Sequence, residues 1–213
     1  MSSEKSGLNM SAARAIRNQI AHSSRSFWEV RDFEGTPLSV AHELSRLAAR
    51  GELVRVRKGL YWRGGDATPL LAPASELVLK RLYPDGGVGP AEWGAATYLR
   101  IGTQIPRRVV WAVPGRAPSG LDKIPLVART GAWKRLVQRL TTDEVALLEL
   151  GRAWNLWVDA SEDEVDAEIQ RRVKTGRIRP VAVRDALLTE PPAVRESIER
   201  VLAPFAGAKL VSA

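Results

Sequence analysis

The segment TPLSVAHELSRLAARGELVRVRKGLYW, residues 36–62, places a helix and a β-hairpin in succession and decides the fold of the first part of the chain. Thr36 is a residue type that caps helix starts, and Pro37 suits the first helical position. Gly51 suits the position just past a helix end. Together these residues predict a helix from Pro37 to Arg50.

The predicted helix has two distinct faces. Its apolar side chains recur at spacings of three and four residues, which suits burial in a core. They are Val40, Ala41, Leu44, Leu47 and Ala48. The opposite face consists of Ser39, His42, Glu43, Arg46 and Arg50. Such a face is either an ordinary solvated surface or a surface that contacts a partner, and the residues after the helix favour a partner.

A short strand with one cationic face follows the helix. Residues 54–57, VRVR, alternate apolar and cationic side chains, so a strand there has its valines on a dry face and its arginines on a basic face. Gly59 allows a reversal after Lys58, and residues 60–62, LYW, suit a return strand. The segment therefore predicts a β-hairpin with a basic rim.

Two further elements precede the capped helix. Residues 10–22 have apolar side chains at helical spacing, with Ser11 as an expected cap. Residues 23–35 predict a short element that ends at Gly35. Helix, short element, capped helix and basic hairpin is the order of a winged helix-turn-helix module, which we predict for residues 1–66.

A winged helix-turn-helix module binds double-stranded DNA through its second helix and its wing. The helix residues expected at the DNA are Thr36, Ser39, His42 and Arg46. The hairpin residues expected at the DNA are Arg55, Arg57 and Lys58. Arginine matches guanine edges and phosphate oxygens, so the helix is expected to select sequence. Cations on the hairpin are expected to contact phosphates, which contributes salt-dependent affinity that is largely independent of sequence.

The remainder of the chain predicts a second domain. Residues 63–75 are rich in Gly, Pro and Ala and predict a linker, so this domain is expected over residues 67–213. Its predicted elements are helices at 74–83 and 90–99, strands at 106–115 and 123–130, and helices from Gly131 onward. The fold class expected for the whole chain is α+β: a winged helix-turn-helix domain followed by a mixed α/β domain with a helical end.

Charge is distributed unevenly along the 213 residues, whose formal net charge is +8. Counting Lys and Arg against Asp and Glu gives +4 for residues 1–69, +7 for residues 70–140 and −3 for residues 141–213. A basic first two thirds fits contact with a polyanion. The alternative is a general compositional bias toward arginine.

Several classes of protein are disfavoured. The chain has no Cys, and its two His, His22 and His42, lack nearby residues at metal-ligand spacing. The nucleotide-binding and hydrolase motifs are missing too, so we expect no metal, no cofactor, no catalytic residue and no enzymatic activity. There is no secretion signal and no run of about 18 apolar residues, so we expect a cytoplasmic protein that does not bind membranes.

Two blocks of the sequence carry a family resemblance. The matching residues of the first block are Phe27, Asp32, Phe33, Leu44, Arg46, Leu47, Gly51, Leu53, Arg55, Val56, Lys58, Gly59, Leu60 and Tyr61. The second block is WGAATYLRIGTQIPRRVVWAVPG, residues 93–115. With these blocks, residues 10–150 resemble the AbiEi-type antitoxins of bacterial abortive-infection and toxin-antitoxin systems.

The resemblance implies a function. It implies a winged-helix domain that represses its own operon at inverted repeats, and a C-terminal domain that counters a cognate nucleotidyltransferase-like toxin without a stable complex. Residues 151–213 match nothing in the family. Because helix-turn-helix proteins often pair on palindromes, dimerisation on DNA is expected. The alternatives are a stand-alone winged-helix transcriptional regulator and a protein-docking module without a toxin partner.

Overall fold

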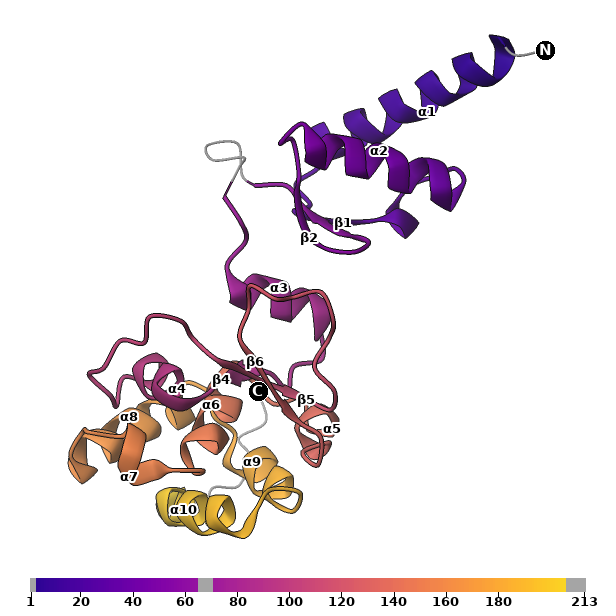
Figure 1. Cartoon of the computed structure of the whole chain (residues 1–213). Helices are drawn as coiled ribbons and strands as arrows, with labels where there is room; N and C mark the ends of the chain where they lie inside the picture. Colours follow the sequence, from indigo (N-terminus) through magenta and orange to yellow (C-terminus); the bar gives the residue numbers. More distant parts are fainter. Residues whose placement is uncertain (1–2, 65–70, 206–213) are drawn as a thin grey trace. The chain divides into compact units, whose positions relative to one another are not determined.

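The computed structural model describes residues 3–64 and 71–205, which form an α+β protein with two three-stranded sheets (Figure 1). The expected α+β class is thereby confirmed. By its internal contacts, the chain divides into two compact units, Met1–Arg81 and Leu82–Ala213. No helix in the described part of the chain combines the length and the apolar character needed to cross a membrane.

The boundary between the two units lies later in the chain than the composition of the sequence predicts. The predicted boundary, between residues 66 and 67, lies outside the described residues. The first unit continues to Arg81 and includes most of helix α3 (Ser75–Leu82). A guanidinium nitrogen of Arg81 lies 2.9 Å from a carboxylate oxygen of Glu29, so an ion pair connects α3 to the first strand. Composition cannot reveal this pairing because the two residues are far apart in sequence.

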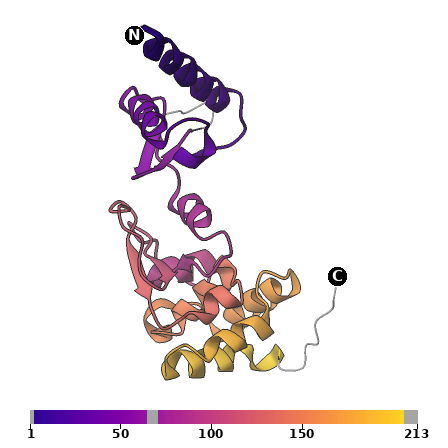
Figure 2. The ribbon, with the colours of Figure 1, turned by 90° about the vertical axis from the view of Figure 1, so that its right-hand side faces the viewer.

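In its described residues, 3–64 and 71–81, the first unit contains three strands and two long helices besides α3. Its elements are α1 (Ser3–Ala21), β1 (Phe27–Glu29), the 3-10 helix η1 (Val30–Asp32), α2 (Pro37–Ala49), β2 (Val54–Arg57) and β3 (Leu60–Trp62). The strands form an antiparallel sheet in the order β1-β3-β2. Helix α1 begins before the predicted residue 10, so Ser11 lies inside it rather than at its cap. Figures 1 and 2 show α1 running past the rest of this unit.

The core of the first unit joins α1, β1, α2 and the hairpin. Its buried side chains are Ile16, Ile20, Trp28, Val40, Leu44, Leu47, Leu53 and Tyr61. The guanidinium of Arg63, just after β3, donates hydrogen bonds to the carbonyls of Ile20 and Ala21 at the end of α1. A cation suits the negative end of a helix dipole, so Arg63 helps to fix α1 against the sheet.

The second unit is a small sheet with helices. Its elements are β4 (Gly89–Pro90), α4 (Glu92–Leu99), β5 (Trp111–Pro114), β6 (Leu126–Arg129), α5 (Lys134–Val137), α6 (Thr142–Leu150), α7 (Trp154–Trp157), α8 (Glu162–Lys174), α9 (Pro180–Leu187), α10 (Pro192–Leu202) and η2 (Ala203–Phe205). The sheet order is β4-β5-β6, with β4 antiparallel and β6 parallel to β5. The predicted strands at 106–115 and 123–130 are confirmed in their later residues, whereas the first residues of both ranges lie outside β5 and β6.

Helix α6 is the centre of the second unit. Every residue from Asp143 to Leu150 is buried, and the helix contacts α4, β4, α9 and α10. Because it is apolar all round except for its acidic residues, it suits burial between layers. The later helices gather on one side of the sheet in Figures 1 and 2.

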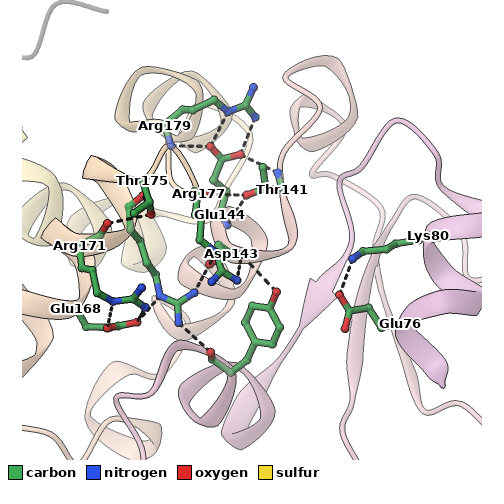
Figure 3. Close-up of polar contacts among 12 residues, drawn as sticks. Glu76, Lys80, Thr141, Asp143, Glu144, Glu168, Arg171, Thr175, Arg177 and Arg179 are labelled. Atoms are coloured by element: carbon green, nitrogen blue, oxygen red, sulfur yellow. Dashed lines mark hydrogen bonds and ion pairs between the residues drawn. The ribbon is translucent and has the colours of Figure 1, made fainter. Parts of the chain in front are cut away.

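Charged side chains connect the start of α6 to the residues around the end of α8 (Figure 3). A carboxylate oxygen of Glu144 lies 2.7 Å from Nη2 of Arg179, and one of Asp143 lies 3.1 Å from Nε of Arg177. Asp143 also pairs with the buried Arg172 of α8. Acidic residues in the first turn of α6 interact favourably with the positive end of the helix dipole. The arginines from elsewhere in the chain offset the desolvation of these buried carboxylates.

Candidate nucleic-acid interface

Helix α2 begins and ends where the sequence predicts. The hydroxyl of Thr36 accepts a hydrogen bond from the backbone N–H of Ser39 at 3.3 Å, and Pro37 is the first helical residue. Gly51 has a φ of +75° just past the helix end, a conformation that glycine adopts readily. The Ser39 hydroxyl donates to the Thr36 carbonyl at 3.0 Å. Thr36 and Ser39 therefore stabilise the start of α2, in addition to the contact with DNA predicted for them.

The two faces of α2 separate largely as predicted, with one correction. Val40, Leu44 and Leu47 are buried, whereas His42 is exposed. Glu43, which the helical pattern places on the polar face, has only 5% of its side chain exposed. It is buried because α1 packs beside α2, and the pattern within one helix cannot show what a second helix covers.

A groove of about 920 Å³ lies between α1 and α2. On the α2 side its lining includes Thr36, Ser39, His42, Glu43 and Arg46. On the α1 side its polar lining is Arg14, Arg17 and Asn18. The structure therefore brings the four predicted helix residues together. Sequence reasoning missed the α1 residues, although their polar side chains alternate with the buried Ile16 and Ile20 in a pattern that indicates a second polar face.

In the β2–β3 hairpin, apolar and cationic side chains do not simply alternate between two faces. Its turn is Lys58 and Gly59, and Gly59 has a φ of +80°. Arg55 lies opposite Tyr61 but Arg57 lies opposite Leu60, so a β-bulge falls between the two arginines. A bulge inserts one extra residue and rotates the strand locally.

The bulge gives the three hairpin cations different surroundings. Arg55 and Lys58 are exposed, whereas Arg57 is half-buried. The Nε of Arg57 is buried and makes no hydrogen bond to any described residue. The prediction that Arg57 shares an exposed basic face with Arg55 is therefore wrong in part. The hairpin cations do not line the groove, so the predicted site consists of two separate groups.

Two cations of the hairpin, Arg55 and Lys58, are exposed. Neither Arg55 nor Lys58 has an ion-pair partner among the described residues. Unpaired surface cations are available to phosphate oxygens, and each such contact releases counterions from DNA. No group of three or more His, Asp or Glu that could hold a metal ion occurs in residues 3–64 and 71–205.

Comparisons with known proteins leave the family open. No protein-family model matches the sequence, and no curated protein matches it. Among solved structures, the RV2827C protein from Mycobacterium tuberculosis is similar at 17% sequence identity with a TM-score of 0.46. The match covers 92% of this chain and 77% of that one. A likeness at this level assigns neither fold family nor function to this chain.

Proposed function

We propose that the first unit is a winged helix-turn-helix domain that binds double-stranded DNA, with α2 in the major groove and the β2–β3 hairpin as the wing. The order of elements supports this proposal. Helix, strand, short helical turn, helix and hairpin follow one another along the chain, with η1 in the place of the middle helix.

The observation that carries the proposal is the presence of exposed polar side chains on both α2 and the hairpin that follows it. His42 and Arg46 are exposed on α2, and Arg46, which pairs with the buried Glu43, has 61% of its side chain exposed. Arg55 and Lys58 lie exposed on the hairpin that follows in the chain. Arg46 can donate to guanine or phosphate, and the hairpin cations suit backbone phosphates.

We also propose the wider role that the family resemblance implies. In this role the protein is an antitoxin without enzymatic activity, which counters a nucleotidyltransferase-like toxin and represses its own operon at inverted repeats. This part rests on the residues shared over positions 10–150, and the neighbouring gene tests it. A nucleotidyltransferase-like reading frame beside this gene, whose toxicity is relieved by co-expression of this protein, is the expected result. A gene neighbourhood without one favours a stand-alone regulator.

DNA binding is tested with the full chain and two labelled duplexes of equal length, one from upstream of its own gene and one unrelated. Fluorescence anisotropy is recorded over a range of salt concentrations. We expect preference for the upstream duplex, and we expect Arg55→Ala with Lys58→Ala to weaken binding to both duplexes and reduce the salt slope by about two. Arg46→Ala is expected to reduce the preference between them.

A matched control is available in the acidic last third of the chain. Lys174 is exposed on α8, so Lys174→Ala removes a surface cation without touching α2 or the hairpin and should leave binding unchanged. Lack of DNA binding by the wild-type protein would overturn the proposal. Unchanged binding in the double variant would overturn the assignment of the wing. If a protein partner then co-purifies at high salt, the first unit is a docking module instead.

A further inference from the structure

A buried carboxylate on α2 is surrounded by three arginines. Oε2 of Glu43 lies 3.0 Å from Nη1 of Arg46, and Oε1 lies 3.3 Å from Nε of Arg17 on α1 and 4.0 Å from Nη2 of Arg50. Glu43 has 5% of its side chain exposed, whereas 47% of Arg17, 61% of Arg46 and 41% of Arg50 is exposed. The Glu43 carboxylate is thus buried, and the three guanidiniums surround it at the surface.

The charges in this cluster do not balance. A desolvated carboxylate needs a cationic partner, and one arginine would suffice for that. Arg50 also pairs with the exposed Glu52 at 2.6 Å, so three guanidiniums and two carboxylates leave a net charge of about +1 by formal count. The surplus faces solvent, where it attracts anions.

The arginines also retain donors for another ligand. Oε1 of Glu43 accepts no hydrogen bond, so Arg17 is held there by charge alone. Nε of Arg17 donates to the carbonyl of Ala13 at 3.2 Å, which anchors its guanidinium to α1. Its Nη groups donate no hydrogen bond to a described residue. A guanidinium fixed at one edge and open at the other matches the bidentate geometry of phosphate.

The position of the cluster indicates which anion it suits. Arg17 and Arg46 line the groove from opposite helices, and Arg14 lies one turn before Arg17 on α1. A helix inserted in a major groove about 12 Å wide has a phosphate strand on each side of it. Since α1 packs beside α2, the groove between them lies where one of those strands would pass.

We propose that the groove between α1 and α2 holds one sugar–phosphate strand of the bound DNA, with Arg14 and Arg17 at its phosphates and Arg46 at its edge, directed at the bases. In this arrangement Glu43 is a positioning residue that keeps Arg17 and Arg46 at a set separation. The inference rests on the DNA binding proposed above and extends the interface from α2 and the hairpin to α1. If Glu43 only fastened α1 to α2, its loss would lower stability without changing how DNA sequences are discriminated.

The test compares Arg17→Ala, Glu43→Gln and the control Arg195→Ala in the full chain, with the upstream and unrelated duplexes. Arg195 is an exposed arginine on α10. Arg17→Ala should weaken binding to both duplexes about 10-fold and lower the salt slope by about one, because a charge-assisted phosphate contact is lost. Arg195→Ala should change neither quantity.

Glu43→Gln has a different expected signature. It removes no phosphate contact, so the salt slope should not fall, but Arg46 loses its fixed position and the preference for the upstream duplex should drop by about 10-fold. Thermal unfolding confirms that each variant is folded at the temperature of measurement. Unchanged preference in Glu43→Gln overturns the positioning role, and unchanged affinity and slope in Arg17→Ala overturn the groove assignment.

Failure of this inference and failure of the DNA-binding proposal give different results. If Arg55→Ala with Lys58→Ala weakens binding while Arg17→Ala does not, DNA binding stands and only the contribution of α1 is wrong. If the wild-type protein binds neither duplex, both are wrong.

Discussion

Arg135 and Glu149 form an ion pair from which water is excluded. Nη1 of Arg135 donates to Oε1 of Glu149 at 2.7 Å, and neither side chain has any exposed surface. Nε of Arg135 donates to Oε1 of Glu190 at 2.6 Å, and Nη2 of Arg129 donates to Oε2 of Glu149 at 2.6 Å. These contacts together connect β6, α5, α6 and Glu190, which lies between α9 and α10.

Loss of one partner of this pair should strongly destabilise the second unit. Arg135→Met removes the cation but keeps an apolar side chain of similar length, and it leaves Glu149 buried with fewer partners. We expect the free energy of unfolding to fall by about 3–5 kcal/mol. Urea denaturation followed by tryptophan fluorescence measures it. The control is Asp85→Asn, since Asp85 lies 3.9 Å from Arg139 with 68% of its side chain exposed. The control should cost less than about 1 kcal/mol, and an equal loss in both variants contradicts the prediction.

Acid should destabilise the second unit through its paired carboxylates. Burial opposes the charged form of Glu149, but hydrogen bonds from Arg129 and the charges of Arg135 and Arg129 outweigh it and hold the pKa of Glu149 below its usual range. A hydrogen bond from Lys134 lowers the pKa of Asp185, against a smaller effect of desolvation. A carboxyl whose pKa is lower in the folded state contributes stability above its unfolded pKa and loses it as the pH falls toward the folded value.

The thermal unfolding midpoint should therefore be constant near neutral pH and decrease below about pH 4.3, the usual glutamate pKa. Asp185→Asn should show a shallower decrease than the wild type, because one of the contributing groups is gone. A midpoint that rises on acidification would contradict the assignment.

A side chain at Gly89 should disrupt the contact between β4 and α6. A Cβ added there would lie 2.8 Å from Cβ of Val145 and 2.9 Å from the carbonyl oxygen of Thr142. Both neighbours belong to a buried helix and cannot move freely, so Gly89→Ala should destabilise by about 1–3 kcal/mol. Gly131→Ala is the matched control, because a Cβ at Gly131 meets nothing within 4 Å. Equal urea midpoints for the two variants would rule out the close contact.

Removal of the Thr36 hydroxyl should loosen the start of α2. Thr36→Ala leaves the backbone N–H of Ser39 without its acceptor and should cost about 1 kcal/mol. Amide hydrogen exchange is the measurement, with faster exchange expected in the first turn of α2 and no change in α8. Thr36→Ser keeps a hydroxyl at the cap and should exchange like the wild type. Unaltered exchange in Thr36→Ala would show that the cap contributes little.

Elements with local signals could be predicted from the sequence. The limits of α2 follow from Thr36, Pro37 and Gly51, and the hairpin turn follows from Gly59, because capping and positive φ act within a few residues. The strands of the second unit were visible as apolar runs between Pro and Gly. The sequence did not predict that β5 and β6 pair in parallel. The relative direction of two strands depends on the path of the connection between them, which apolar runs do not show.

For the candidate interface, the sequence by itself predicted the helix residues Thr36, Ser39, His42 and Arg46, and it determined the basic composition of the hairpin. Only the tertiary structure decided that Glu43 is buried beneath arginines from two helices, and that a bulge turns Arg57 partly inward. The reason is physical: periodicity reports which residues share a face of one element. Burial and ion pairing depend on which other element packs against that face, and here that element is α1.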